Sequence, residues 1–506
     1  MIELLESRIA PAAVFSYTDV AGNKVTIVTS KGTDADLAAA AGNITSGQLK
    51  VLNLQNSAFS GANVTITAVP QHGSGDGLAD IGEIAAAGVN LGVVTVHGDL
   101  DVFTVGNGVG TAVKSLNVVS IGLLGANTGL NAFGIEAVGG IGALNVKTDV
   151  VGAEISATGS IGPVTIGGSF IGNDVSGTGY LTSTGNMGVV RIGGDLIAGP
   201  AELTGTIFCQ GSLAGVTVGG SVIGGSQNAT GAIVSTGNMG PVRIGHDVTG
   251  AGGFESGFIG SGIVTIGFAL SSEISANISS VTIGGSLIGG SVTGSGAITS
   301  SNNMGPVKIG GSIIGGPAKL AGNISSEGAL SSLTVDGNIT GESGFPVLID
   351  AGGPTVHSAT ADVAIGGINV GGDLSYVNIE AGYSNSTAFN AEAQIGAVHV
   401  AGDWLASNLV AGVDNPASNN GDFGNANDAV ITTGAKIVSR IASIVIGGLV
   451  EGTFSSVSNS DHFGFVAQTI GSFSVGGVAI PLARGPAALL YPLGVTGDVD
   501  IHELGS

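Results

Sequence analysis

Short apolar bursts, separated by glycine and small polar residues, recur along this chain with a nearly constant step. Residues 164–169 read Val-Thr-Ile-Gly-Gly-Ser, and the later copies keep the same alternation of apolar and polar positions before the glycines. The copies start 26 residues apart at Val164, Val190, Val216 and Val242, and again at Val281, Val307 and Leu333. A fixed period of this length indicates a solenoid, in which each repeat buries its apolar face only against its neighbours.

Each copy also predicts its own local structure. In Val-Thr-Ile the two apolar side chains point to one face of an extended strand and the threonine points to the other. The repeat that starts at Val216 holds three bursts, at residues 216–218, 222–223 and 232–234, with glycine at the corners. We therefore expect an all-β fold, a parallel β-helix (β-solenoid) with about 26 residues per coil. The right-handed, three-faced form is preferred, because a left-handed hexapeptide helix would need about 18 residues per coil.

The start of the chain departs from this pattern and predicts a cap. Residues 14–17 and 24–28 are rich in β-branched and aromatic residues and flank a polar turn, so they favour a β-hairpin. Residues 33–40 then predict a short helix with a threonine as its N-cap. Weaker copies of the repeated phrase at 52–54 and 94–96 extend the solenoid towards this cap.

The predicted organisation has four parts. They are an N-terminal arm at 1–13, a capping hairpin and helix at 14–48, the β-solenoid at 49–478, and a C-terminal cap or assembly tail at 479–506. A loop insertion near 413–428, rich in Asn, Gly and Asp, interrupts the solenoid. The tail holds an apolar stretch around Leu489, Leu490 and Tyr491, which is either a folded cap or a surface completed by another copy.

A second, longer period lies on top of the first. An Asn-Met-Gly word precedes three of the repeats, and in each of these the outward residue is basic: Arg191, Arg243 and Lys308. The intervening repeats carry threonine at that position, which keeps the like charges two coils, or about 10 Å, apart. Two interpretations stay open for this column: a solvated charged surface, or a stripe that docks an acidic neighbouring surface.

Composition and charge exclude several classes of function. The chain has 506 residues with 93 glycines, only 13 Lys and Arg, and a formal net charge of -23. Binding of nucleic acid or of an anionic membrane surface needs clustered basic residues, so neither partner is expected. The chain has one cysteine, Cys209, which rules out an internal disulfide. No apolar run is long enough for a transmembrane helix, so no membrane span is expected.

The repeated phrase and one N-terminal word resemble the Gly-rich β-strand-repeat proteins exported to the surface of planctomycete- and verrucomicrobial-type bacteria. The phrase Val-Thr-Ile-Gly-Gly-Ser/Asp-Leu-Ile-Gly covers roughly residues 90–480. Residues 4–12, Leu-Leu-Glu-Ser-Arg-Ile-Ala-Pro-Ala, are similar to the LEPR-XLL motif of those proteins. Ser7 stands where proline is usual, and Ala-Pro replaces the leucine pair. The resemblance implies an extracellular or cell-surface location, and it carries no catalytic residues.

The insertion is the one candidate site for a metal. Its carboxylates Asp414, Asp422 and Asp428 are oxygen ligands at short spacing, which suits a hard cation such as calcium. A loop rich in Asn, Asp and Gly also forms without a metal, so that alternative stays open. No other cofactor is expected.

An enzymatic function is not expected. A polysaccharide-active β-helix would need convergent carboxylates for acid–base chemistry and aromatic platforms for sugar rings. The lone tryptophan, Trp404, has few aromatic companions in the sequence.

The sequence therefore favours a non-enzymatic structural protein of the bacterial cell exterior that assembles with copies of itself. Head-to-tail contacts between the apolar tail (Leu489, Leu490, Tyr491) and the N-terminal arm would give filaments or a surface layer, with the basic column as a second contact. The alternative is a monomeric adhesin or passenger-type binding module, with a cell-surface polysaccharide as its partner. A polysaccharide-active enzyme is the least favoured alternative.

Overall fold

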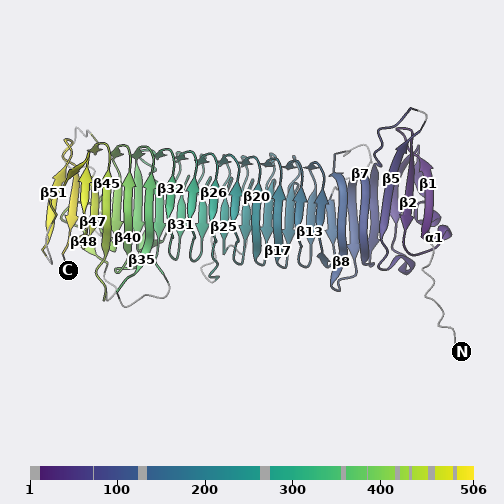
Figure 1. The fold of residues 1–506 in the computed structure, drawn as a ribbon, viewed down its shortest axis with the longest axis horizontal. Coiled ribbons are helices and arrows are strands. Elements are labelled where there is room, and N and C mark those ends of the chain that lie inside the picture. Colours follow the sequence, from purple (N-terminus) through teal and green to yellow (C-terminus); the bar gives the residue numbers. More distant parts are fainter. Residues whose placement is uncertain are drawn as a thin grey trace. The chain divides into compact units, whose positions relative to one another are not determined.

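A computed structural model describes residues 12–71, 73–123, 134–262, 274–354, 360–384, 386–415, 422–431, 436–453, 462–482 and 487–505. The chain forms two compact units, Met1–Val218 and Gly219–Ser506. In each unit the strands stack side by side as a series of mostly parallel rungs (Figure 1). The predicted β-solenoid is thus confirmed, while its handedness stays a prediction. The predicted arm at 1–13 falls almost entirely outside the described residues.

The first unit begins with the predicted cap. Strands β1 (Ala13–Thr18) and β2 (Asn23–Thr29) form an antiparallel hairpin. The helix α1 (Asp34–Ala40) follows, and its N-cap Thr33 exchanges hydrogen bonds with Asp36 in a capping box. Strand β2 also pairs antiparallel with β5 (Val64–Pro70), from which the parallel stack continues. The hairpin and the helix predicted for 14–48 are confirmed.

The repeated Val-x-Ile phrase forms one continuous column of strands in this unit. Its regular part consists of β14 (Val164–Ile166), β17 (Met187–Ile192) and β20 (Leu213–Val218). Val164 lies beside Val190, and Val190 beside Val216, so the 26-residue step equals one coil. All three valines are buried, whereas Arg191 on the same column is exposed. This is the alternation that the Val-Thr-Ile pattern predicts.

The second unit continues the same kind of column. Its strands, each parallel to the next, are β23 (Val242–Ile244), β26 (Val281–Ile283), β29 (Val307–Ile309), β32 (Leu333–Val335), β35 (Val363–Val370), β40 (Gln394–Val400), β45 (Arg440–Ile446) and β49 (Phe473–Val475). Val242 lies beside Val281 although 39 residues separate them. The column thus keeps its register across this longer coil.

A coil contributes three strands, as the three apolar bursts predict. The coil that starts with β26 adds β27 (Leu287–Ile288) and β28 (Ile298–Ser300), and each pairs in parallel with its equivalent in the next coil. The inward positions of these strands form aliphatic ladders in the core.

One inward position next to a corner is polar and forms a ladder of its own. Ser261 lies beside Ser300, and their hydroxyl oxygens are 3.2 Å apart. Both residues are fully buried. Both hydroxyls donate to the carbonyl of Ala276, so the buried donors are satisfied. In the first unit Cys209 occupies the matching place beside Ser183 and is fully buried. The cysteine is therefore a buried member of this ladder.

One sequence register was wrong. The phrase at 52–54 looks like the first weak copy, but Leu52 in β4 (Gln48–Asn53) lies beside Ile84 of β6 (Ile81–Ala87). Val64 of β5 is the residue that lies beside Val94 in the repeated column. The apolar alternation is the same in both columns, so the pattern alone could not assign Leu52 to the correct side of the coil.

The C-terminal stretch is folded. Strand β52 (Val499–Glu503) adds a parallel rung to β47 (Phe463–Ala467), and β51 (Leu489–Leu493) turns back antiparallel on β52. The repeated column ends in the same way, because β50 (Val478–Ala479) turns back on β49. Across the described ranges, no helix has the length and hydropathy needed to cross a bilayer.

The register of the repeated column makes a direct stability prediction. Val164→Asp would place a carboxylate at a position with 0% exposure, flanked by apolar side chains. We expect it to lower the free energy of unfolding by roughly 3–5 kcal/mol, measured by urea denaturation. Thr165→Asp, the same change one residue along at an exposed position, is the matched control and should cost less than about 1 kcal/mol. Equal losses in both variants would contradict the register.

Candidate functional site

The structure contains a cleft that the sequence did not predict. It has a volume of about 760 Å³ and lies in the second unit. Its floor is the outer face of three neighbouring parallel strands, β34 (Val347–Ala351), β37 (Val377–Ala381) and β42 (Asn408–Ala411). On these strands the residues at alternate positions face the core, and those between them face the cleft. Residues from the loops around the floor complete its walls: Lys319, Ser343, Phe345, Ser386, Asp414, Asn415, Asp422, Phe423 and His462.

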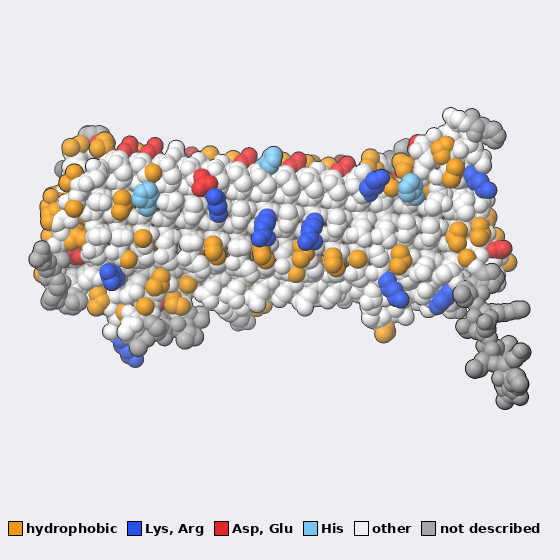
Figure 2. Space-filling model, in the orientation of Figure 1, with side chains coloured by type: hydrophobic (Ala, Val, Ile, Leu, Met, Phe, Trp, Pro, Cys, Tyr) orange, Lys and Arg blue, Asp and Glu red, His pale blue; other side chains and the backbone are white. Residues whose placement is uncertain are grey.

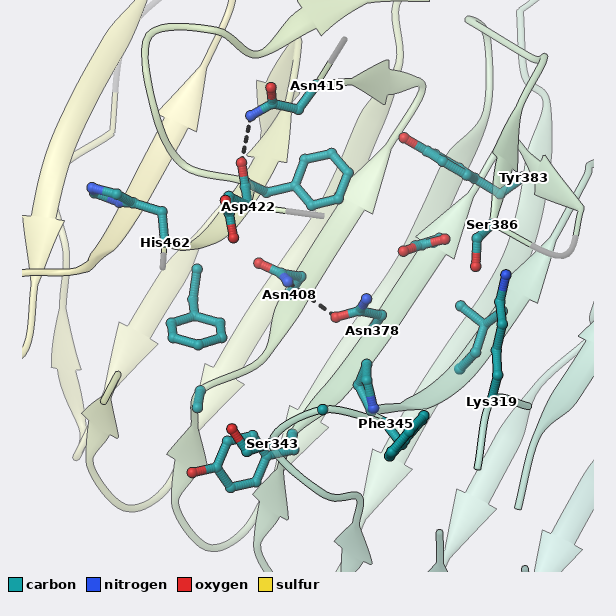
Figure 3. A pocket seen from close by; sticks show the side chains of 18 of the residues that line it. Lys319, Ser343, Phe345, Asn378, Tyr383, Ser386, Asn408, Asn415, Asp422 and His462 are labelled. Carbon is teal, nitrogen blue, oxygen red and sulfur yellow. Dashed lines mark hydrogen bonds between the residues drawn. The ribbon is translucent and has the colours of Figure 1, made fainter. Parts of the chain in front are cut away.

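Two stacked asparagines form the centre of the floor. Asn378 lies beside Asn408 one coil along, and Asn408 Nδ2 donates to Asn378 Oδ1 at 3.0 Å. Asn408 Oδ1 in turn accepts the Gly464 N–H at 2.8 Å, which fixes the orientation of both amides. Figure 3 shows this pair with Tyr383 and Asn415 on one side and Ser343 and Phe345 on the other.

Two acidic residues lie beside each other at one side of the floor. Asp350 and Glu380 are neighbours across β34 and β37, and both are at most 3% exposed. Burial raises the pKa of Glu380 to about 8, and the charges of Asp350 and Asp414 add to that increase. Glu380 is therefore protonated at neutral pH. Its Oε2 is enclosed and has no hydrogen-bond partner among the described residues.

The roof of the cleft is an apolar cluster that seals the loops onto the strands. Tyr383 belongs to a short hairpin, β38 (Tyr383–Ser384) with β39 (Thr387–Ala388), and its hydroxyl donates to the Val413 carbonyl. The buried cluster consists of Tyr383, Ala391, Val410, Val413, Phe423, Ile431 and Val466. Val410 and Val466 come from the outer faces of β42 and β47, so the loops are anchored on the solenoid by apolar burial.

The predicted insertion forms one wall of this cleft. It is closed at its base by β43 (Val413–Asp414), which pairs antiparallel with β44 (Ala429–Val430). Asp414 and Asp422 line the cleft, and residues 416–421 lie outside the described part. The described residues of the insertion thus lie at the surface of the solenoid and pack against it.

Asp428, the third predicted calcium ligand, holds the loop together. One of its oxygens accepts Asn415 Nδ2 at 3.2 Å, and the other accepts the N–H groups of Gly424 and Asn425 at 2.9 and 3.1 Å. His502 Nδ1 lies 2.6 Å from that second oxygen. Among the described residues no three His, Cys, Asp or Glu side chains are grouped so that they could hold a metal ion. Calcium binding by Asp414, Asp422 and Asp428 stays a prediction.

The basic column lies on the outer wall of the solenoid, as predicted. Arg191, Arg243 and Lys308 are exposed, and threonines occupy the coils between them within each unit. Lys308 Nζ lies 3.2 Å from Asp336 Oδ2 of the next coil, with both side chains about half exposed. Such an exposed ion pair contributes little to stability. In Figure 2 the basic side chains stand apart from one another on a wall of mostly small, uncharged residues.

The predicted assembly residues of the tail lie in the terminal strand. Leu489, Leu490 and Tyr491 belong to β51, whose only partner among the described strands is β52. Leu490 is 52% exposed, while Leu489 and Tyr491 are half-buried.

Sequence reasoning missed the acidic pair, although a signal was present. The words Ile-Asp-Ala-Gly, Ile-Glu-Ala-Gly and Leu-Val-Ala-Gly begin 30 residues apart at Ile349, Ile379 and Leu409. That constant step places the middle residues beside each other on one column. The burial of both carboxylates had no signal in the sequence, because it depends on the covering loops.

Comparison of the chain with protein-family models, with curated proteins and with solved structures finds no significant match in any of the three. The chemistry of the cleft therefore has to be argued from its geometry alone. A concave site of this size, with aromatic walls and a few fixed polar groups, has the character of a ligand-binding site.

The burial of Glu380 predicts a pH dependence of stability. Because its pKa is raised in the folded state, folding takes up a proton between the ordinary glutamate pKa and about 8. The stabilisation is thus fully present below about pH 4.5 and is lost as the pH rises to 8. We expect the melting temperature to fall across this window, and Glu380→Gln to flatten the fall. Glu342→Gln, at an exposed position of the same unit, is the control and should retain the wild-type slope. A slope that is identical in all three proteins would contradict the protonated state of Glu380.

Proposed function

We propose that this chain is a non-enzymatic structural protein of the bacterial cell exterior that associates with copies of itself head to tail. The observation that carries the proposal is the concentration of exposed apolar side chains near the terminal strands. Val478, Leu490 and Val495 are 64%, 52% and 78% exposed. They lie on or next to β50 and β51, which are the last strands of their columns. Figure 2 shows hydrophobic side chains gathered at the end of the second unit that carries β51.

The first strands of the first unit also carry exposed apolar side chains. Val14 of β1 and Val69 of β5 are 48% and 62% exposed, and Val20 in the hairpin turn is 71% exposed. Strand β1 pairs with β2 on one side only among the described strands. Exposed apolar side chains beside an unpaired strand edge favour association with another chain. A contact between the two different ends is heterologous, and it produces an open filament unless its rotation closes a ring.

The internal strands of the repeated column differ from the terminal strands in their backbone, although single apolar side chains such as Val175 and Leu449 are also exposed elsewhere. Every internal strand of the repeated column pairs on both sides, so its backbone groups are already used. The last strands are also protected in part: β50 has two residues, and Pro492 removes one N–H from β51. Self-association would therefore depend on apolar side chains at the ends more than on a continuous backbone ladder.

A double substitution at the C-terminal end tests the proposal. Val478→Lys combined with Leu490→Lys places two charges on the exposed apolar surface. The association constant should therefore fall about tenfold or more, which corresponds to a loss of about 1.4 kcal/mol or more. Sedimentation velocity across a concentration series, followed by negative-stain microscopy, measures it. Ile314→Lys, at a side-wall position that is 41% exposed, is the matched control and should associate like the wild type. A wild-type chain that is monomeric at every concentration would favour the monomeric adhesin instead.

The basic column gives a separate test of lateral contacts. If Arg191, Arg243 and Lys308 dock an acidic neighbouring surface, changing all three to threonine should weaken association and leave the melting temperature unchanged. Salt should have the same effect on the wild type, because exposed charges are screened over about 8–10 Å near physiological ionic strength. Association that responds to neither change would make the column a solvated surface. It would leave the end-to-end contact untouched, since that contact is apolar.

A further inference from the structure

We propose that the cleft over β34, β37 and β42 binds a segment of a neutral glycan chain. This goes beyond the proposed self-association and does not depend on it, because the floor of the cleft is formed by β34, β37 and β42, whereas the apolar side chains of the proposed contact lie on or next to β50 and β51. Three features carry the inference: polar groups with unused hydrogen-bonding capacity, an exposed aromatic ring at the rim, and an excess of acidic over basic groups.

The unused polar groups lie on the floor. Asn378 Oδ1 accepts from Asn408, while Asn378 Nδ2 donates to no described residue and faces the cleft. Glu380 Oε2 is buried and has no partner in the described part of the chain. The Asn378 amide N–H₂ can donate to the hydroxyl groups of a sugar, and the protonated Glu380 carboxyl lies two residues along on the same strand, β37. A ligand with such hydroxyls would satisfy the Asn378 amide.

The aromatic group lies at the rim. Phe345 is 41% exposed, and it is held in a tight turn by two backbone hydrogen bonds with Glu342, of 3.2 and 2.9 Å. Tyr376, half-buried, lines the same side of the cleft. An exposed aromatic ring beside fixed polar groups provides an apolar face for the C–H side of a sugar ring. Such a ligand would account for the exposure of Phe345, which folding alone does not favour.

The charge of the cleft limits the ligand further. Its lining holds the acids Glu380, Asp414 and Asp422 against one exposed lysine, Lys319, and His462. An anionic chain built from uronic acids or sulfated sugars would be repelled by these carboxylates. Protonation of Glu380 lowers the negative charge at the centre of the floor at neutral pH. The carboxylates thus disfavour an anionic chain, and the uncharged asparagines and protonated Glu380 offer a cationic chain no opposite charge at the centre of the floor.

The arrangement of the floor also suits a polymer. Leu348, Asn378 and Asn408 follow one another on adjacent coils, so equivalent positions repeat about every 4.8 Å along the solenoid axis. Figure 3 shows Lys319 and His462 at opposite sides of the asparagine pair, with the floor continuing between them. A chain that runs along the axis would meet Leu348 on one coil and an asparagine amide on each of the next two.

Isothermal titration calorimetry with three neutral hexasaccharides, cellohexaose, maltohexaose and N-acetylchitohexaose, tests the proposal on the full chain. We expect at least one to bind, and we expect Asn378→Ala and Phe345→Ala each to weaken that binding by about tenfold. Asn145→Ala, which removes an exposed asparagine from the solenoid wall outside the cleft, is the control and should bind like the wild type. Circular dichroism melting of each variant separates lost binding from lost folding.

Three results would overturn the proposal. The first is the absence of binding by all three hexasaccharides at millimolar concentration. The second is tighter binding of hexagalacturonate, or of the cationic glucosamine hexamer in a salt-dependent manner, since either would assign the cleft to a charged ligand. The third is binding that Asn378→Ala and Phe345→Ala leave unchanged, which would place the sugar elsewhere. None of these results bears on self-association, which is measured without a ligand.

Discussion

In-register stacking of one coil on the next is the constraint on which the rest of this structure depends. Neighbouring strands in a parallel ladder lie about 4.8 Å apart, so each residue has the equivalent residues of two other coils as its closest neighbours. At the corners the backbones come even closer. A Cβ on Gly162 would lie 1.8 Å from the carbonyl oxygen of Gly142, and one on Gly290 would lie 1.9 Å from that of Ala251. Only glycine fits these positions, which explains why the composition is so rich in this residue.

The same constraint determines where the chain is free to vary. A strand position cannot change its register without exposing its apolar side chains, but a corner can lengthen because it leaves the ladder. Val242 and Val281 keep their places beside each other across a coil of 39 residues. The cleft arises in this way, since the hairpin at Tyr383 and the insertion after Val413 both extend from corners and fold back onto the outer wall. Local irregularity at the corners thus creates a concave site on a wall that is otherwise even.

The fold could be predicted from the sequence because the apolar and glycine positions that determine it recur at a fixed step. The valines at 164, 190 and 216 predict both the coil length and the inward face, and the capping box at Thr33 and Asp36 marks the helix start. Prediction failed where two columns share one pattern, as at Leu52, and where a side chain acquires its environment from a distant loop. Calcium binding by Asp428 stays a prediction, but the environment of its carboxylate could not be predicted. Its contact with His502, 74 residues away, depends on the last strand. Glu380 was overlooked because a glutamate in a strand gives no sign that a loop will cover it.

The nearest-neighbour character of the ladder has a consequence for how such a chain changes its length over generations. Each coil contacts only the coil before it and the coil after it. Those two flanking coils present similar apolar surfaces to the coil between them. Thr282 and Thr334, for example, lie on either side of Lys308 in one column. If the coil between them were lost from the gene, the two flanking strands would meet with matching valine and isoleucine or leucine side chains. The length of the protein can therefore change by whole coils. Duplication or loss of a coil lengthens or shortens the solenoid and leaves the packing of the remaining core unchanged.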